Sequence, residues 1–168
     1  MIGGGARFLG STVAGQLTAN IEISANAAYL FQLDKKGTEN NKGTIALGLQ
    51  PSFSWDPSSD YYSAMVFSRY YYNFERVSPF IEVDLGFARK NIFSTSSGEL
   101  SSYEESFVPG GKLGGAFYVS PHVTFDAFLF YNAFYTTVNA IESQISSQNF
   151  NYNFGLGLGF QIFLQCKK

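Results

Sequence analysis

The sequence is poor in the residue types from which most catalytic and metal sites are built. Its 168 residues include one cysteine, Cys166, and one histidine, His122. A single cysteine excludes an internal disulfide, and a single histidine excludes metal sites that need two histidine ligands. Charged residues make up only 14% of the chain and the formal net charge is -2, which argues against nucleic-acid binding.

Long hydrophobic runs are also missing. The longest apolar stretch, Val123 to Tyr135, is interrupted by Asp126 and Asn132, whereas a membrane helix needs roughly 18 apolar residues. The opening MIGGGARFLG has no basic stretch followed by an apolar core, so no secretory signal is expected in it. If the protein is exported, we expect this to be the mature form with a replacement start methionine. The single cysteine is expected to be an incidental thiol rather than part of an added tail.

What the sequence does contain is alternation, clearest in its last stretch, Phe150 to Leu164. Side chains on a strand point to opposite faces with period two. One face here is wholly apolar and the other is almost wholly Asn, Gly and Gln, so the glycine face has almost nothing to pack. The simplest arrangement places lipid on the apolar face and a narrow polar barrel lumen on the other. The apolar face consists of Phe150, Tyr152, Phe154, Leu156, Leu158, Phe160, Ile162 and Leu164.

The same pattern recurs along the chain and predicts eight strands. Connections rich in Gly, Asn, Pro, Asp and Ser separate them, and we expect those at 14–19, 55–60, 92–105 and 138–148 to be long and to point outward. The aromatic content of 18% fits rings placed at a water–hydrocarbon boundary. The predicted fold is all-β, a single domain over 1–168 that forms an eight-stranded antiparallel up-and-down transmembrane β-barrel. The predicted strands cover 3–13, 20–33, 44–55, 61–74, 78–89, 106–120, 123–137 and 150–164.

Charged residues fall on the face opposite the aromatics in the clearest strands. A charge on the lipid side costs about 2–4 kcal/mol at mid-depth for Arg or Lys, so this sorting supports the assignment of faces. A tight turn at Glu75–Arg76 places Arg69 across from Glu82. We predict a lumen ion-pair network, with Arg69 contacting Glu82, Asp84 and Asp126, which fills the barrel; a gated ion or proton route is the alternative. The six inward charges are Glu22, Arg69, Glu82, Asp84, Lys112 and Asp126.

Other candidate chemistry is weaker. His122 lies in the short turn Ser120-Pro121-His122, which we place on the periplasmic side and expect to be solvated. The run GLGLGF at 155–160 lacks the strand–loop–helix context of a phosphate loop. The acidic segment with Glu99, Glu104 and Glu105 is expected to be a solvated loop rather than a cation site or a surface for a host protein. We expect no catalytic, metal or cofactor site.

Several segments resemble a known family. They are IGG at 2–4, SRYYYNFERVSPFIEVDLGF at 68–87, GGAFYVSPHVTFDAFLFY at 114–131 and the glycine-alternating last strand. The chain resembles the small outer-membrane β-barrel domain proteins of Gram-negative bacteria, of the type common in Bacteroidota and akin to OmpX and the OmpA barrel. The resemblance implies an outer-membrane location and no particular activity. The chain departs from the family in its longer connection at 33–43, and in ending on Gln165-Cys166-Lys167-Lys168 rather than on the terminal aromatic that the assembly machinery reads.

These observations favour a non-enzymatic outer-membrane barrel with a structural role, or with binding and adhesion through its outward connections. The expected partners are the lipid bilayer and lipopolysaccharide, the outer-membrane assembly machinery and a host or surface ligand. Two alternatives stay open. One is a soluble lipocalin-like binder with its aromatics pointing inward, and the other is an outer-membrane lipid hydrolase or acyltransferase.

Overall fold

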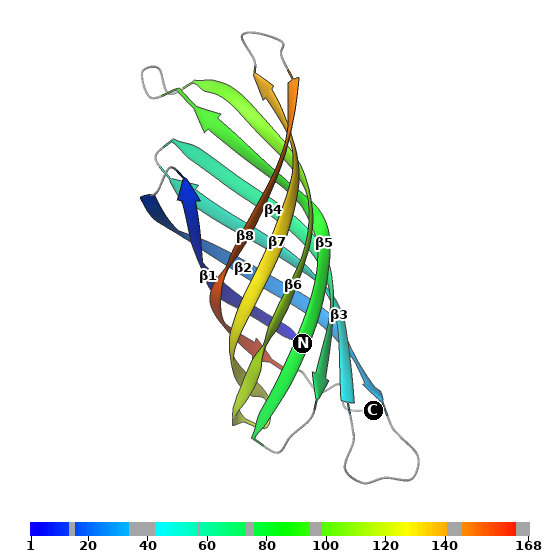
Figure 1. Cartoon of the computed structure of the whole chain (residues 1–168). Coiled ribbons are helices and arrows are strands. Elements are labelled where there is room, and N and C mark those ends of the chain that lie inside the picture. The colour runs from blue at the N-terminus through cyan, green and yellow to red at the C-terminus, as the bar shows by residue number, and fades with distance from the viewer. Residues whose placement is uncertain are drawn as a thin grey trace.

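The computed structural model shows eight antiparallel strands that form one closed barrel (Figure 1). It describes residues 1–13, 16–33, 43–56, 58–72, 76–94, 99–140 and 146–163. Each strand pairs with the next one along the chain, and β1 pairs with β8 to close the ring. Within these described ranges, no helix is both long and apolar enough to cross a membrane. The strands are β1 (Ile2–Val13), β2 (Gln16–Leu33), β3 (Gly43–Asp56), β4 (Ser59–Tyr72), β5 (Val77–Phe93), β6 (Leu100–Ser120), β7 (Val123–Ala140) and β8 (Ser146–Ile162).

Alternation in the sequence becomes alternation between the inside and the outside of the barrel. Strand β5 shows it most regularly, because every second residue from Ser78 to Ala88 is buried and each residue between them is exposed. The exposed set includes Ile81, Val83 and Leu85. The period of two is what a strand with two different environments requires. The predicted fold, an eight-stranded up-and-down barrel, is confirmed.

The apolar faces of the strands point outward, whereas in a soluble barrel they point inward. The side chains of Phe154 and Leu156 are both 64% exposed, whereas Arg69 is 3% exposed and Asp126 is fully buried. A lipocalin-like calyx needs its aromatic side chains inside the barrel. Here the interior holds paired charges together with a few rings, and most of the large apolar side chains point outward, so the calyx interpretation is wrong.

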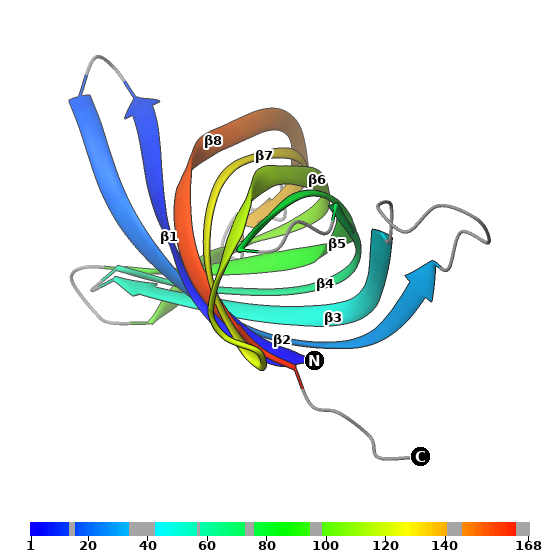
Figure 2. The ribbon, with the colours of Figure 1, turned by 90° about the horizontal axis from the view of Figure 1, so that it is seen from below.

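The barrel has two different ends. The end that carries the start of β1 at Ile2 and the end of β8 at Ile162 also holds the turn at Pro121–His122, and we call it the termini end. The opposite end holds the tips of four hairpins, made by β1–β2, β3–β4, β5–β6 and β7–β8, and we call it the hairpin end (Figure 1). Seen along the barrel, the β1–β2 hairpin swings away from the other strands (Figure 2).

At the hairpin end the strands extend well into segments predicted as long loops. Strand β6 begins at Leu100 and β5 ends at Phe93, so most of 92–105 is a hairpin, including Glu104 and Glu105. Similarly, β2 begins at Gln16, β7 ends at Ala140 and β8 begins at Ser146. The loop prediction was wrong because polar residues are frequent on both faces of these extensions. Polarity removes the alternation signal without preventing backbone pairing.

Some predicted features lie outside the described residues. They are the end of the fourth predicted strand with Glu75, most of the connection at 33–43, and the tail with Cys166.

Candidate functional site: the lumen network and the outer wall

The centre of the lumen is organised by Arg69 on β4. Its register partner on β5 is Glu82, so both side chains enter the lumen at the same level. The Nε atom of Arg69 lies 2.5 Å from Oε2 of Glu82. Both side chains are buried, and a buried ion pair persists only when further hydrogen bonds satisfy its remaining donors and acceptors.

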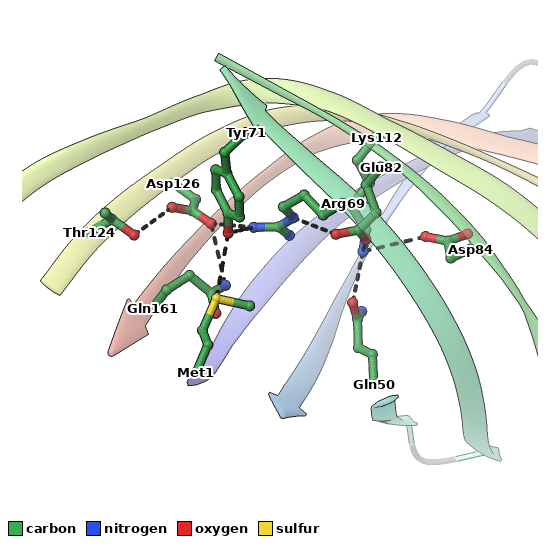
Figure 3. A network of polar contacts seen from close by, with 10 residues as sticks. All are labelled: Met1, Gln50, Arg69, Tyr71, Glu82, Asp84, Lys112, Thr124, Asp126 and Gln161. Carbon is green, nitrogen blue, oxygen red and sulfur yellow. Dashed lines mark hydrogen bonds and ion pairs between the residues drawn. The ribbon is translucent and has the colours of Figure 1, made fainter. Parts of the chain in front are cut away.

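Those further bonds come from the far wall. The Nη1 atom of Arg69 lies 2.8 Å from Oδ2 of Asp126 on β7, and it also donates to the Tyr71 hydroxyl oxygen at 3.0 Å (Figure 3). Asp126 in turn accepts hydrogen bonds from Thr124 Oγ1 at 3.0 Å and from Gln161 Nε2 at 3.3 Å. The carboxylate is therefore held from β4, from β7 itself and from β8.

Lys112 on β6 is the second cation of the network. Its Nζ atom forms a close ion pair with Oε1 of Glu82, which is its register partner, and lies 3.4 Å from Oδ2 of Asp84. It also donates a hydrogen bond to Gln50 Oε1 on β3 at 2.7 Å (Figure 3). Glu82 thus bridges the two cations, one through each carboxylate oxygen.

The structure joins five of the six predicted lumen residues into one cluster. The prediction placed Asp84 beside Arg69, and the structure places it beside Lys112 instead. Glu22 is buried on β2, opposite Arg7 in the β1–β2 register, and the described ion pairs do not connect it to the other five. Sequence reasoning missed Tyr71, Thr124 and Gln161, although all three share the inward face of their strands.

Aromatic rings fill the space around the ions. The guanidinium carbon of Arg69 lies 4.2 Å from the ring centroid of Phe80, and the rings of Phe80 and Phe128 are 6.4 Å apart. A cation over a ring face is attracted by the ring quadrupole, most strongly where water is excluded. Phe67 and Tyr71 belong to the same buried cluster. The lumen at this level is closed by rings and ion pairs together.

Two glycines create the room that this packing uses. A Cβ atom on Gly110 would lie 2.2 Å from both Asp84 Oδ1 and Asn132 Oδ1. A Cβ atom on Gly157 would lie 2.3 Å from the ring of Phe128. Any side chain at either position would displace a lumen group, so these glycines are needed for close approach.

Phe163, which follows β8, packs against two rings at the termini end and is half-buried. Its ring centroid lies 6.3 Å from that of Tyr71 and 6.1 Å from that of Tyr118. Its backbone N–H donates to the carbonyl of His122 at 2.7 Å. His122 itself is exposed in the turn, as expected for a solvated histidine.

The outer wall forms a continuous apolar belt. On β8 it runs from Phe150 to Ile162, which corresponds to a height of roughly 30 Å at the usual tilt of barrel strands. A shallow groove of about 720 Å³ crosses β3 to β6 within it, lined mostly by Leu, Val and Pro around Ser68. Exposed rings gather toward both ends of the belt. At the hairpin end neighbouring strands place Phe87, Phe107 and Tyr135 side by side, with centroids 5.6 and 6.4 Å apart.

Exposed charges appear where the belt ends. The guanidinium carbon of Arg89, two residues beyond Phe87 on β5, lies 4.6 Å from the ring centroid of Tyr103, and its Nη1 atom lies 3.7 Å from Oε1 of Glu105.

Within the part of the chain that the structure describes, no three His, Cys, Asp or Glu side chains lie close enough together to bind a metal ion.

The architecture of this barrel is similar to that of solved outer-membrane proteins. The chain aligns with the crystal structure of Neisserial surface protein A (NspA) over 97% of its own length and 96% of that chain, with a TM-score of 0.59 and 17% identity. The chain has the fold of the eight-stranded outer-membrane barrels. The outer membrane enzyme PagL aligns over 98% of this chain and 100% of its own, with a TM-score of 0.54 and 11% identity. A major outer membrane protein from Thermus thermophilus aligns over 96% of both chains, with a TM-score of 0.52 and 13% identity.

At these identities the likeness concerns the fold alone. No protein-family model matches the chain, and no curated protein sequence does. The neighbours include an enzyme, so the fold does not decide between catalysis and binding.

Proposed function

We propose that this chain is an integral outer-membrane barrel without enzymatic activity, which presents a binding surface at its hairpin end. The observation that carries the proposal is the separation of the two faces. Two cations and three carboxylates are buried in the lumen, while the exposed face of β8 from Phe150 to Ile162 is apolar. In water this arrangement exposes the hydrophobic surface and buries the charges, and only a surrounding hydrocarbon phase makes it favourable.

The ends of the barrel support an orientation. Outer-membrane barrels usually have short turns on the periplasmic side and more extended structure outside. Two-residue connections occur at both ends, and the nine-residue connection between β2 and β3 is at the termini end, so strand length carries the orientation. Strands β6 and β7 extend past the belt rings Phe107 and Tyr135 to Leu100 and Ala140 at the hairpin end. We therefore place the hairpin end outside the cell and the termini end in the periplasm, with lipopolysaccharide and the assembly machinery as expected partners.

A closed lumen supports a scaffold rather than a pore. Arg69, Phe80 and Phe128 meet near the axis, and an eight-stranded barrel is just wide enough for side chains to fill it. Recognition then falls to the hairpin end, since binding residues concentrate on segments held by a rigid scaffold.

The experiment has two parts. The protein is refolded in detergent and run on a gel with and without boiling, and a band that shifts on boiling shows a folded membrane barrel. A protein that stays soluble and monomeric without detergent would refute the membrane assignment.

The second part tests for enzymatic activity on lipid. Lipid A and phospholipids from cells with and without the protein are compared by mass spectrometry. We expect identical lipid species, and a new deacylated or acylated species would instead support a lipid hydrolase or acyltransferase.

A further inference from the structure

Strand β8 extends beyond its pairing with β1. The last pair joining these strands is Gly10 with Phe154, yet β8 begins at Ser146. On its other side β8 stays paired with β7 as far as Asn139 and Ser146. Across the described parts of β1 and β2, nothing pairs with the β1-facing side of β8 from Ser146 to Asn153. Figure 1 shows the β7–β8 hairpin rising well past the tip of β1.

This segment, which we call the β8 edge (residues 146–153), presents an unpaired row of backbone N–H and C=O groups. Natural proteins usually protect such edges with lysine, proline or a bulge. The sequence SSQNFNYN contains no charge and no proline, and its register with β7 runs without a bulge from Ser146 to Ile162. Its side chains from Ser146 to Tyr152 are all exposed. Among the residues that the structure describes, the edge is therefore open and carries none of these protections.

The side chains of the β8 edge add a recognisable pattern. Phe150 and Tyr152 share the outer face, where their ring centroids lie 5.0 Å from that of Tyr135 and 6.2 Å from that of Tyr131, respectively. Asn149 and Asn151 alternate with these rings on the opposite face. A row of rings thus extends from β7 to the β8 edge. A further strand that paired with this edge would have rings beside it on one face of the sheet and amide side chains on the other.

We propose that the β8 edge binds an extended, uncharged polypeptide segment of a partner protein by strand addition. Main-chain hydrogen bonds to the edge supply the affinity, and alternation of apolar and polar side chains in the partner supplies the specificity. The inference rests on the proposed function, which places residues 146–149 in water beyond the apolar belt, with Phe150 and Tyr152 at the rim of the belt.

A second copy in the same membrane does not fit the edge. Two barrels with the same orientation are related by an axis along the membrane normal, so strands tilted by about 35–45° cross at roughly 70–90°. Neighbouring strands of one sheet differ by only about 20–25°. The edge therefore requires a partner that is free to align with it.

The test uses a fluorescent synthetic peptide with the sequence of residues 146–153, which has the required alternation and no charge. It is titrated with the folded barrel in detergent micelles, and binding is read by fluorescence anisotropy. The matched control is the same peptide N-methylated at alternate residues, which keeps every side chain but removes the N–H groups of one edge. We expect saturable binding of the parent peptide and loss of binding by the methylated one.

Two barrel variants locate the site. Gln148→Lys adds a charge on the edge, and Thr137→Lys adds the same charge to its register partner, one strand inside. We expect about a tenfold loss of affinity for the first and little change for the second. Heat-modifiable migration of each variant shows that the barrel is folded, so a failure of membrane folding is distinguished from a failure of peptide binding.

Three outcomes of the peptide titrations overturn the inference. The parent peptide does not bind the folded barrel, or the methylated peptide binds equally well, or both lysine variants bind like the parent. A barrel dimer in sedimentation experiments that Gln148→Lys dissociates would assign the edge to a second copy, which also overturns it.

Discussion

Arg69 and Asp126 form an ion pair across the lumen, with 2.8 Å between the guanidinium and the carboxylate, although 57 residues separate them in the chain. Strands β4 and β7 are not neighbours in the ring, since β5 and β6 lie between them. The ion pair therefore connects opposite parts of the wall. The Lys112–Glu82 pair joins β5 to β6, so the two ion pairs together connect four strands through the lumen.

Replacing Arg69 tests how much the network stabilises the barrel. Arg69→Met removes the cation paired with Asp126 and one of the two cations paired with Glu82, and it leaves both carboxylates buried. Breaking a buried ion pair in this way costs about 3–5 kcal/mol. We expect a correspondingly lower free energy of unfolding in urea, measured on barrels folded in lipid vesicles. The double variant Arg69→Met/Asp126→Asn is expected to recover part of the loss, because it removes one uncompensated charge.

The exposed pair of Arg89 and Glu105 is the matched control for that variant. Its side chains are about half exposed and 3.7 Å apart, so Arg89→Met is expected to change stability by less than about 1 kcal/mol. Equal losses for Arg69→Met and Arg89→Met would contradict a stabilising role for the lumen network.

Gly110 tests the close packing of the lumen. In Gly110→Ala the new methyl group would overlap Asp84 Oδ1 and Asn132 Oδ1, each 2.2 Å away. Overpacking of this kind costs about 1–3 kcal/mol, and we expect a lower midpoint of thermal unfolding in detergent. Gly115→Ala on the same strand is the control, since its nearest neighbour would be 3.6 Å away. If the two substitutions prove equally tolerated, the lumen is less tightly packed than proposed.

The apolar belt predicts a position-dependent effect of charge on membrane insertion. Leu156 lies in the middle of the belt on β8 and points outward, so Leu156→Arg is expected to destabilise the inserted barrel by about 2–4 kcal/mol. Gln148→Arg places the same charge on the same face of β8, beyond the last ring at Phe150, and is expected to be close to neutral. Equilibrium folding into vesicles measures both, and similar losses would place the bilayer elsewhere on the barrel.

The filled lumen predicts the absence of a pore. Purified protein in planar bilayers is expected to give no steady conductance, with a large porin as the positive control. The physical reason is that Arg69, Phe80 and Phe128 meet near the axis of the barrel. A steady conductance that Arg69→Met abolishes would favour the alternative of a gated ion route.

Much of this structure could be predicted from short-range pattern. Residues such as Leu156 and Gly157 alternate so regularly that the strand and its two faces follow from the sequence. Even the opposition of Arg69 and Glu82 follows from a tight turn between two strands, because a hairpin fixes register locally. The extents of the strands at the hairpin end could not be predicted, since polar residues such as Ser102 and Asn139 pair without any alternation signal.

The sequence by itself determined how many strands form, which face of each strand meets lipid and which charges are turned inward, because these depend only on side chains two residues apart. The closed ring decided how the inward carboxylates divide between the two cations. The sequence predicted Glu82, Asp84 and Asp126 beside Arg69. In the structure Glu82 and Asp126 contact Arg69, whereas Asp84 lies beside Lys112, which is across from Glu82. The stagger of the strands in the closed barrel sets the level of each residue along the barrel axis. This stagger cannot be read from the spacing of residues within one strand or one hairpin.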